Sequence, residues 1–166
     1  MRRHYKALSF RESSILTIAF AAIEVFPKEC MGGMLAVPGR IPLVSAAVPY
    51  QLAKRTTEGV DTYSSPKLSS MRLGRLVKIG DFHSHPFAGA KDSEPLKPSE
   101  YDFEASVEGE VDLIVRVVSA RLKMHRSLRK HGKSLSMSEG RFRILVKAYY
   151  RGVNNYEEID IRLCKE

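Results

Sequence analysis

The segment at residues 76–85 is typical of a strand that ends in His83-Ser84-His85. Its apolar and β-branched residues favour extended backbone, and Gly80-Asp81-Phe82 leads directly into the two histidines. Successive side chains of a strand point to opposite faces, so His83 and His85 share one face and Ser84 occupies the other. Two imidazoles on one face can bind a single cation, and the sequence therefore predicts a metal site on a sheet.

A helix followed by a buried strand is expected before this segment. Ser9-Phe10-Arg11-Glu12 has the spacing of a capping box, and Pro27 should end the helix because proline disfavours helix at the preceding residue. Between them, apolar residues recur at helical spacing: Ile15, Ile18, Ala19, Ala22 and Ile23. The apolar run at residues 34–37 then favours a buried strand.

Further strands are expected at residues 41–50, 60–63, 111–118, 142–150 and 158–163, with a closing hairpin through residues 152–155. Polar loops should separate the early strands, including residues 64–70. The order of helix, strands, short helix and strands predicts an α+β fold in one domain spanning residues 1–166. Helices should cover a mixed, curved sheet.

The formal net charge of +8 comes mostly from one segment. Residues 121–140 hold six Lys and Arg against one acid, Glu139. A basic cluster is the electrostatic footprint of nucleic-acid binding, but this segment contains no aromatic residue to stack on bases. A solvated basic loop at residues 121–140 is therefore favoured over an RNA platform, and an acidic protein partner is an alternative.

No apolar run reaches the length of a membrane span, and no secretory signal follows Met1-Arg2-Arg3, so a cytoplasmic location without membrane contact is expected. Cys30 and Cys164 do not make a disulfide framework. Cys30 is predicted to be a packing residue rather than a nucleophile.

A metal held by two histidines needs a third ligand, which is often a carboxylate. Ser99 has the position of a helix cap, and Asp102 lies in the first turn that follows, so Asp102 is the candidate third ligand. Glu29 follows the first helix and precedes a buried strand, a position suited to a carboxylate projecting into a cleft. It is the candidate general base, and its rival Glu24 fits better as a helix residue.

These residues resemble the JAMM motif of the JAB1/MPN/Mov34 metalloproteases. The family pattern joins an upstream glutamate, a His-Ser/Thr-His-Pro element and a later Ser-x-x-Asp, which here match Glu29, the element at residues 83–86, Ser99 and Asp102. The interval between His85 and Ser99, residues 86–98, is longer than is usual in the family. Ser93 fits the usual spacing, but Leu96 then replaces the aspartate and cannot bind metal. Ser99 and Asp102 are the favoured pair, and the long interval is expected to form a loop bordering the substrate groove.

The resemblance implies an MPN-like fold and zinc-dependent cleavage of peptide or isopeptide bonds at the C-terminal tail of a ubiquitin-like or sulfur-carrier protein. It implies that His83, His85 and Asp102 bind Zn²⁺, that Glu29 is the general base and that Ser99 donates to the oxyanion. Two other classes stay open: a catalytically silent MPN scaffold or binding module, and a basic nucleic-acid-binding domain. The remaining histidines, His4, His125 and His131, are interpreted as structural or surface residues.

Overall fold

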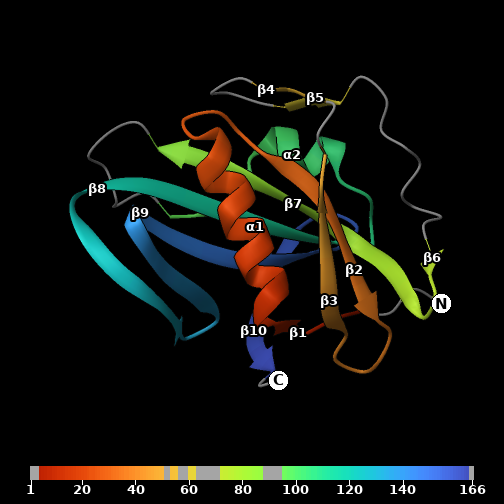
Figure 1. Cartoon of the computed structure of the whole chain (residues 1–166). Helices are drawn as coiled ribbons and strands as arrows, with labels where there is room; N and C mark the ends of the chain where they lie inside the picture. Colours follow the sequence, from red (N-terminus) through yellow and green to blue (C-terminus); the bar gives the residue numbers. More distant parts are fainter. Residues whose placement is uncertain (1–3, 51–52, 56–59, 63–71, 88–94, 165–166) are drawn as a thin grey trace.

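The computed structural model of the chain describes residues 4–50, 53–55, 60–62, 72–87 and 95–164. Most of these residues form strands, and seven of the strands join into a closed ring in which each is hydrogen-bonded to the next (Figure 1). Around the ring the order is β2 (Met31–Val37), β3 (Leu43–Pro49), β1 (Ala7–Arg11), β10 (Tyr156–Cys164), β9 (Ser134–Arg151), β8 (Val111–His131) and β7 (Leu76–Phe87), which pairs again with β2.

The remaining strands and the helices do not belong to this ring. The short β6 (Arg72–Leu73) pairs with β7, while β4 (Ala53–Arg55) and β5 (Val60–Thr62) form a separate two-stranded sheet. Within the described residues there are two helices, α1 (Glu12–Val25) and α2 (Glu100–Ala105). Neither helix is both long and apolar enough to cross a membrane.

The predicted α+β architecture, a curved sheet covered by helices, is wrong. The structure is mostly β, and the sheet closes because β7 pairs with β2 as well as with β8. Closure also uses the chain ends, since β1 pairs in parallel with both β10 and β3. Local periodicity indicates strands but carries no information on which distant strands meet, so the barrel could not be inferred from it.

The start of the first helix also differs from prediction. Ser9 does not cap the helix, because it lies in β1, where its backbone N–H donates to Pro42 O at 2.9 Å. Arg11 occupies the N-cap position and makes no side-chain capping bond. Sheet pairing on both sides of β1 therefore outweighs the local capping pattern. The helix ends at Val25, ahead of Pro27 as predicted.

The apolar side of α1 packs into the main core. Ile15, Ile18, Ala19 and Ala22 are buried as the spacing predicted, whereas Ile23 is partly exposed. They join core residues from the strands, and Figure 1 shows α1 lying against the sheet. Burying a large aliphatic side chain contributes about 1.5–3 kcal/mol, so this side of α1 anchors the segment that precedes Glu29.

The basic segment is not a loop. Residues 121–131 continue β8 and residues 134–140 begin β9, paired in the register Ser127↔Ser138 and Arg129↔Ser136. Leu135 and Met137 are buried in the core and alternate along β9 with the serines at 134, 136 and 138. The high charge obscured this alternation in the sequence.

The other predicted strands are found, several of them longer than expected. The short strand near residue 60 is present as β5, and the closing hairpin joins β9 to β10. The loops expected at residues 64–70, and the part of the interval after His85 that includes Ser93, lie outside the described residues.

One close approach fixes where β7 meets β8. Gly80 has φ 155°, and a Cβ built there would lie 1.9 Å from Val111 O. Only glycine fits, because any side chain would overlap the neighbouring backbone. From Gly80↔Val111 the two strands run in parallel register through His85↔Arg116.

Candidate metal centre

The two histidines of β7 project from the same face of the strand. Between them, Ser84 is fully buried on the core side, and its Oγ accepts a hydrogen bond from Cys30 N at 2.8 Å. Phe82 is also buried in the core. The predicted alternation is confirmed: Ser84 is structural, and Cys30 is a buried packing residue.

Helix α2 brings the third side chain. Ser99 is its N-cap, and a capping box joins it to Asp102: Ser99 Oγ accepts from Asp102 N at 3.1 Å, while Ser99 N donates to Asp102 Oδ2 at 2.6 Å. The predicted cap is therefore confirmed. The Ser99 hydroxyl also donates to Asp102 Oδ2 at 2.8 Å, so the serine holds the carboxylate in place.

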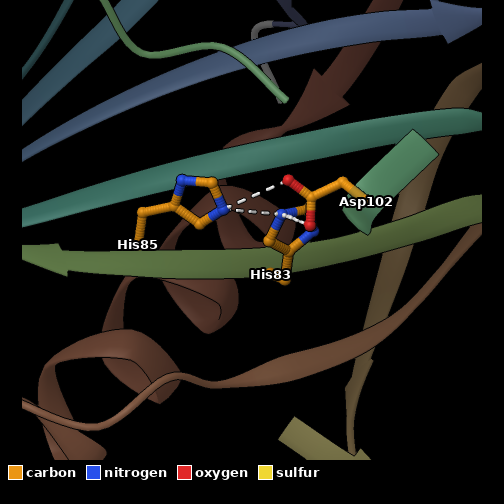
Figure 2. A group of neighbouring side chains, drawn as sticks. All are labelled: His83, His85 and Asp102. Carbon is orange, nitrogen blue, oxygen red and sulfur yellow. Dashed lines mark hydrogen bonds and ion pairs between the residues drawn. The ribbon is translucent and has the colours of Figure 1, made fainter. Parts of the chain in front are cut away.

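His83, His85 and Asp102 converge although they come from two elements (Figure 2). The two Nε2 atoms of the histidines lie 3.0 Å apart. His83 Nε2 is 3.2 Å from Asp102 Oδ1, and His85 Nε2 is 3.5 Å from Asp102 Oδ2. All three candidate donor atoms lie within 4.8 Å of one another.

This spacing fits a single small cation. Two donors bonded at about 2.0–2.1 Å to one tetrahedral ion lie about 3.3 Å apart, and the observed separations of 3.0, 3.2 and 3.5 Å bracket that value. Two imidazoles and a carboxylate form a donor set that zinc accepts, leaving a fourth position for water or substrate. The residues present therefore fit a catalytic type of metal centre.

The charges of the three groups support one another. Burial lowers the pKa of His83, but the hydrogen bond and the charge of Asp102 outweigh it and hold that pKa above its ordinary value. Burial acts to raise the pKa of Asp102, yet hydrogen bonds from His83 and His85 bring it well below its usual range. A cation entering the site would replace the proton that His83 shares with Asp102.

Glu29 lies next to this group without belonging to it. Met31 pairs with His83, and Ser84 N donates to Cys30 O at 2.9 Å, so continuing the antiparallel register places Glu29 opposite His85. Burial raises the pKa of the Glu29 carboxyl, while the charges of His85 and His83 oppose that rise. A partly buried carboxyl with a raised pKa beside a metal site is well suited to accepting and returning a proton.

The hydroxyl of Tyr156 supports the position of α2, a role that was not predicted from the sequence. Tyr156 of β10 donates its phenolic hydrogen to Asp112, and its oxygen also lies 2.7 Å from Ser106 Oγ and 3.2 Å from Asp102 O. Burial raises the pKa of Asp112 to about 6, although the bond from Tyr156 opposes this shift. No local pattern around Tyr156 signals this role, because its partners lie far away in the sequence.

A second set of contacts holds α2 against the strands. The Arg151 guanidinium lies 3.3 Å from the centre of the Phe103 ring and donates to Val153 O at 2.9 Å. Before the helix, Tyr149 donates its hydroxyl hydrogen to Leu96 O, and Leu96 is buried against Tyr149. Since α2 itself has no buried residue, these contacts fix its position.

The other candidates are not part of the group. Glu24 is exposed on α1, and His4 is exposed on the surface, 2.9 Å from Glu157. His125 and His131 are exposed on the β8–β9 hairpin.

Comparisons with known proteins give structural likenesses only. No family model matches the chain, and no curated protein matches it. A protein from Desulfitobacterium hafniense with a known solution structure is similar at 17% identity and a TM-score of 0.57, over 96% of this chain and 94% of that one. A JAB1/MPN domain protein from Archaeoglobus fulgidus is similar at 15% identity and a TM-score of 0.48, over 93% of this chain and 99% of that one. At such identity, the first likeness concerns the fold alone.

Proposed function

We propose that this protein is a zinc-dependent hydrolase that cleaves a peptide or isopeptide bond at the C-terminal tail of a ubiquitin-like or sulfur-carrier protein. The observation that carries the proposal is the convergence of His83, His85 and Asp102, with Glu29 opposite His85. The choice of substrate rests on the resemblance of these residues to the JAMM motif.

Each residue has a role that follows from its place. His83, His85 and Asp102 would hold the ion, which when bound supplies a Lewis acid that activates water near neutral pH. Glu29 accepts the proton of the attacking water and delivers it to the leaving amine, because its raised pKa suits both transfers. An oxyanion-binding role for Ser99 requires its hydroxyl to turn away from Asp102.

The test is cleavage of a ubiquitin-like fusion whose scissile bond follows Gly-Gly. Protein loaded with zinc is incubated with the fusion, and products are followed by mass spectrometry. We expect cleavage after Gly-Gly that stops when a chelator is added and returns with zinc.

Absence of cleavage in zinc-loaded protein, across fusion and isopeptide-linked forms, would contradict the proposal and favour a silent scaffold. Cleavage that persists in chelator would contradict the role of the metal.

A further inference from the structure

A cavity of about 630 Å³ lies along the β8–β9 hairpin. None of the three candidate metal ligands lines it. No Asp or Glu is found among the described residues that line it. The ionisable side chains of the lining are all arginine or histidine, namely Arg116, Arg126, Arg129, Arg143, His125 and His131.

Sheet register connects this cavity with the candidate metal centre. His85 on β7 pairs with Arg116 on β8, and Arg116 pairs in turn with Leu145 on β9. Register partners on adjacent strands share a face, and adjacent strands lie about 4.8 Å apart. The lining of the cavity therefore begins one strand away from His85, on the same face.

The arginines of the lining differ in their exposure to solvent and in their ion pairs. Arg126 is exposed and forms an ion pair with Glu139, so part of its charge is already balanced. Arg116 is only 7% exposed, and attraction between charges is stronger where water is scarce. Arg129 is exposed at the rim, opposite Ser136.

The rest of the lining narrows the class of ligand. Apolar side chains also line the cavity, among them Val118, Met124, Met137 and Leu145, and no Phe, Tyr or Trp is found among the described residues that line it. Binding of single-stranded nucleic acid relies on stacking of bases on aromatic rings. Guanidinium forks bind carboxylates in pairs of hydrogen bonds, and the apolar side chains suit an aliphatic neighbour.

We propose that this arginine-lined cavity docks an acidic segment of the protein substrate, one in which carboxylate and aliphatic side chains alternate. The identity of the partner rests on the proposed function, since the same face leads to His85. The docking itself requires neither metal nor Glu29.

The first experiment measures binding alone, on metal-free protein, by fluorescence anisotropy. Three labelled probes are used: a peptide of alternating glutamate and leucine, its glutamine–leucine counterpart, and single-stranded oligothymidine. We expect the glutamate peptide to bind best and the Arg129→Glu variant to bind it about tenfold more weakly. Arg121→Glu is the matched control, because Arg121 is exposed on the same hairpin outside the cavity lining and the charge change is identical.

Three outcomes would overturn the proposal. One is equal weakening by Arg129→Glu and Arg121→Glu, which would mean that net charge alone attracts the peptide. Another is equal binding of the glutamate and glutamine peptides. The third is tighter binding of oligothymidine that depends on Arg129, which would make the cavity a nucleic-acid site.

The second experiment places each peptide segment beside the Gly-Gly tail of the fusion substrate and compares kcat/KM. We expect the wild-type protein and Arg121→Glu to prefer the glutamate fusion, and Arg129→Glu to lose about tenfold of that preference. An unchanged preference in Arg129→Glu would refute docking of the substrate. If no fusion is cleaved at all, the hydrolase proposal fails, while the binding experiment still decides whether the cavity holds an acidic segment.

Discussion

At the scale of single residues, the candidate centre depends on side chains that are held before any ion arrives. The carboxylate of Asp102 accepts two hydrogen bonds from Ser99. Ser84, between the two histidines, donates its backbone N–H to Cys30 O and accepts the Cys30 N–H at its Oγ. Ligands fixed in this way lose little freedom when they bind a cation. Glu29 is different, since it lies close enough to sense the charges of the histidines but supplies none of the three grouped ligand atoms.

This difference predicts that Glu29→Gln separates metal binding from hydrolysis. The variant should retain zinc, because all three ligands remain, and should lose at least about 100-fold in kcat, because glutamine cannot accept the proton. Zinc content and turnover of the Gly-Gly fusion are measured on the same preparation. Glu24→Gln, on the exposed side of α1, is the control and should leave both unchanged. Normal turnover in Glu29→Gln would remove Glu29 from the mechanism.

The candidate residues could be predicted from the sequence because each depends on local geometry. Strand alternation places His83 and His85 on one face, and a capping box lies within four residues of chain, from Ser99 to Asp102. The supporting bonds of Tyr156 could not be predicted. They cross between α2, β8 and β10, and no spacing in the sequence marks residues that meet only after folding.

At the scale of elements, α2 is a short helix held by polar contacts rather than by burial. Tyr156 links it to β8 by contacting Asp102 O, Ser106 Oγ and Asp112 together. The position of the third candidate ligand therefore depends on a hydroxyl group from β10.

We predict that Tyr156→Phe weakens zinc binding by about tenfold, as is usual when a group that supports a metal ligand is lost. The loss also leaves the buried Asp112 carboxyl without its donor from Tyr156. Affinity is measured by competition with a chromophoric chelator. Tyr101→Phe is the matched control, since Tyr101 is on the same helix and 71% exposed. Equal affinities in the wild-type protein and Tyr156→Phe would show that α2 is held without this hydroxyl.

The sequence predicted where most strands lie, but not how long they are, and it placed the start of the first helix wrongly. The β-branched content of residues 111–118 indicated β8, but the strand continues to His131 because Leu128 and the buried Met137 opposite it pack toward the core. The pattern at Ser9 to Glu12 was overridden because β1 pairs on both sides.

At the scale of the whole molecule, barrel closure brings the parts of the centre together. Pairing of β2 with β7 sets Glu29 beside the histidines, and pairing of β7 with β8 sets the arginine-lined cavity beside His85. Both pairings join segments that are far apart in the sequence. Local sequence patterns therefore could not predict that the sheet closes. The resulting surface carries the candidate ligands, the candidate base and the cavity next to one another.

The proposed function requires His83, His85 and Asp102 to bind one zinc ion, and the zinc content of the protein tests this directly. Protein purified without chelator, and the same protein loaded with zinc and desalted, is analysed by inductively coupled plasma mass spectrometry. We predict about one zinc per chain in the wild-type protein and in His4→Ala, where the removed histidine is on the surface, and almost none in His83→Ala. A wild-type protein that holds no zinc after loading, or a His83→Ala variant that holds as much as wild type, would contradict the account.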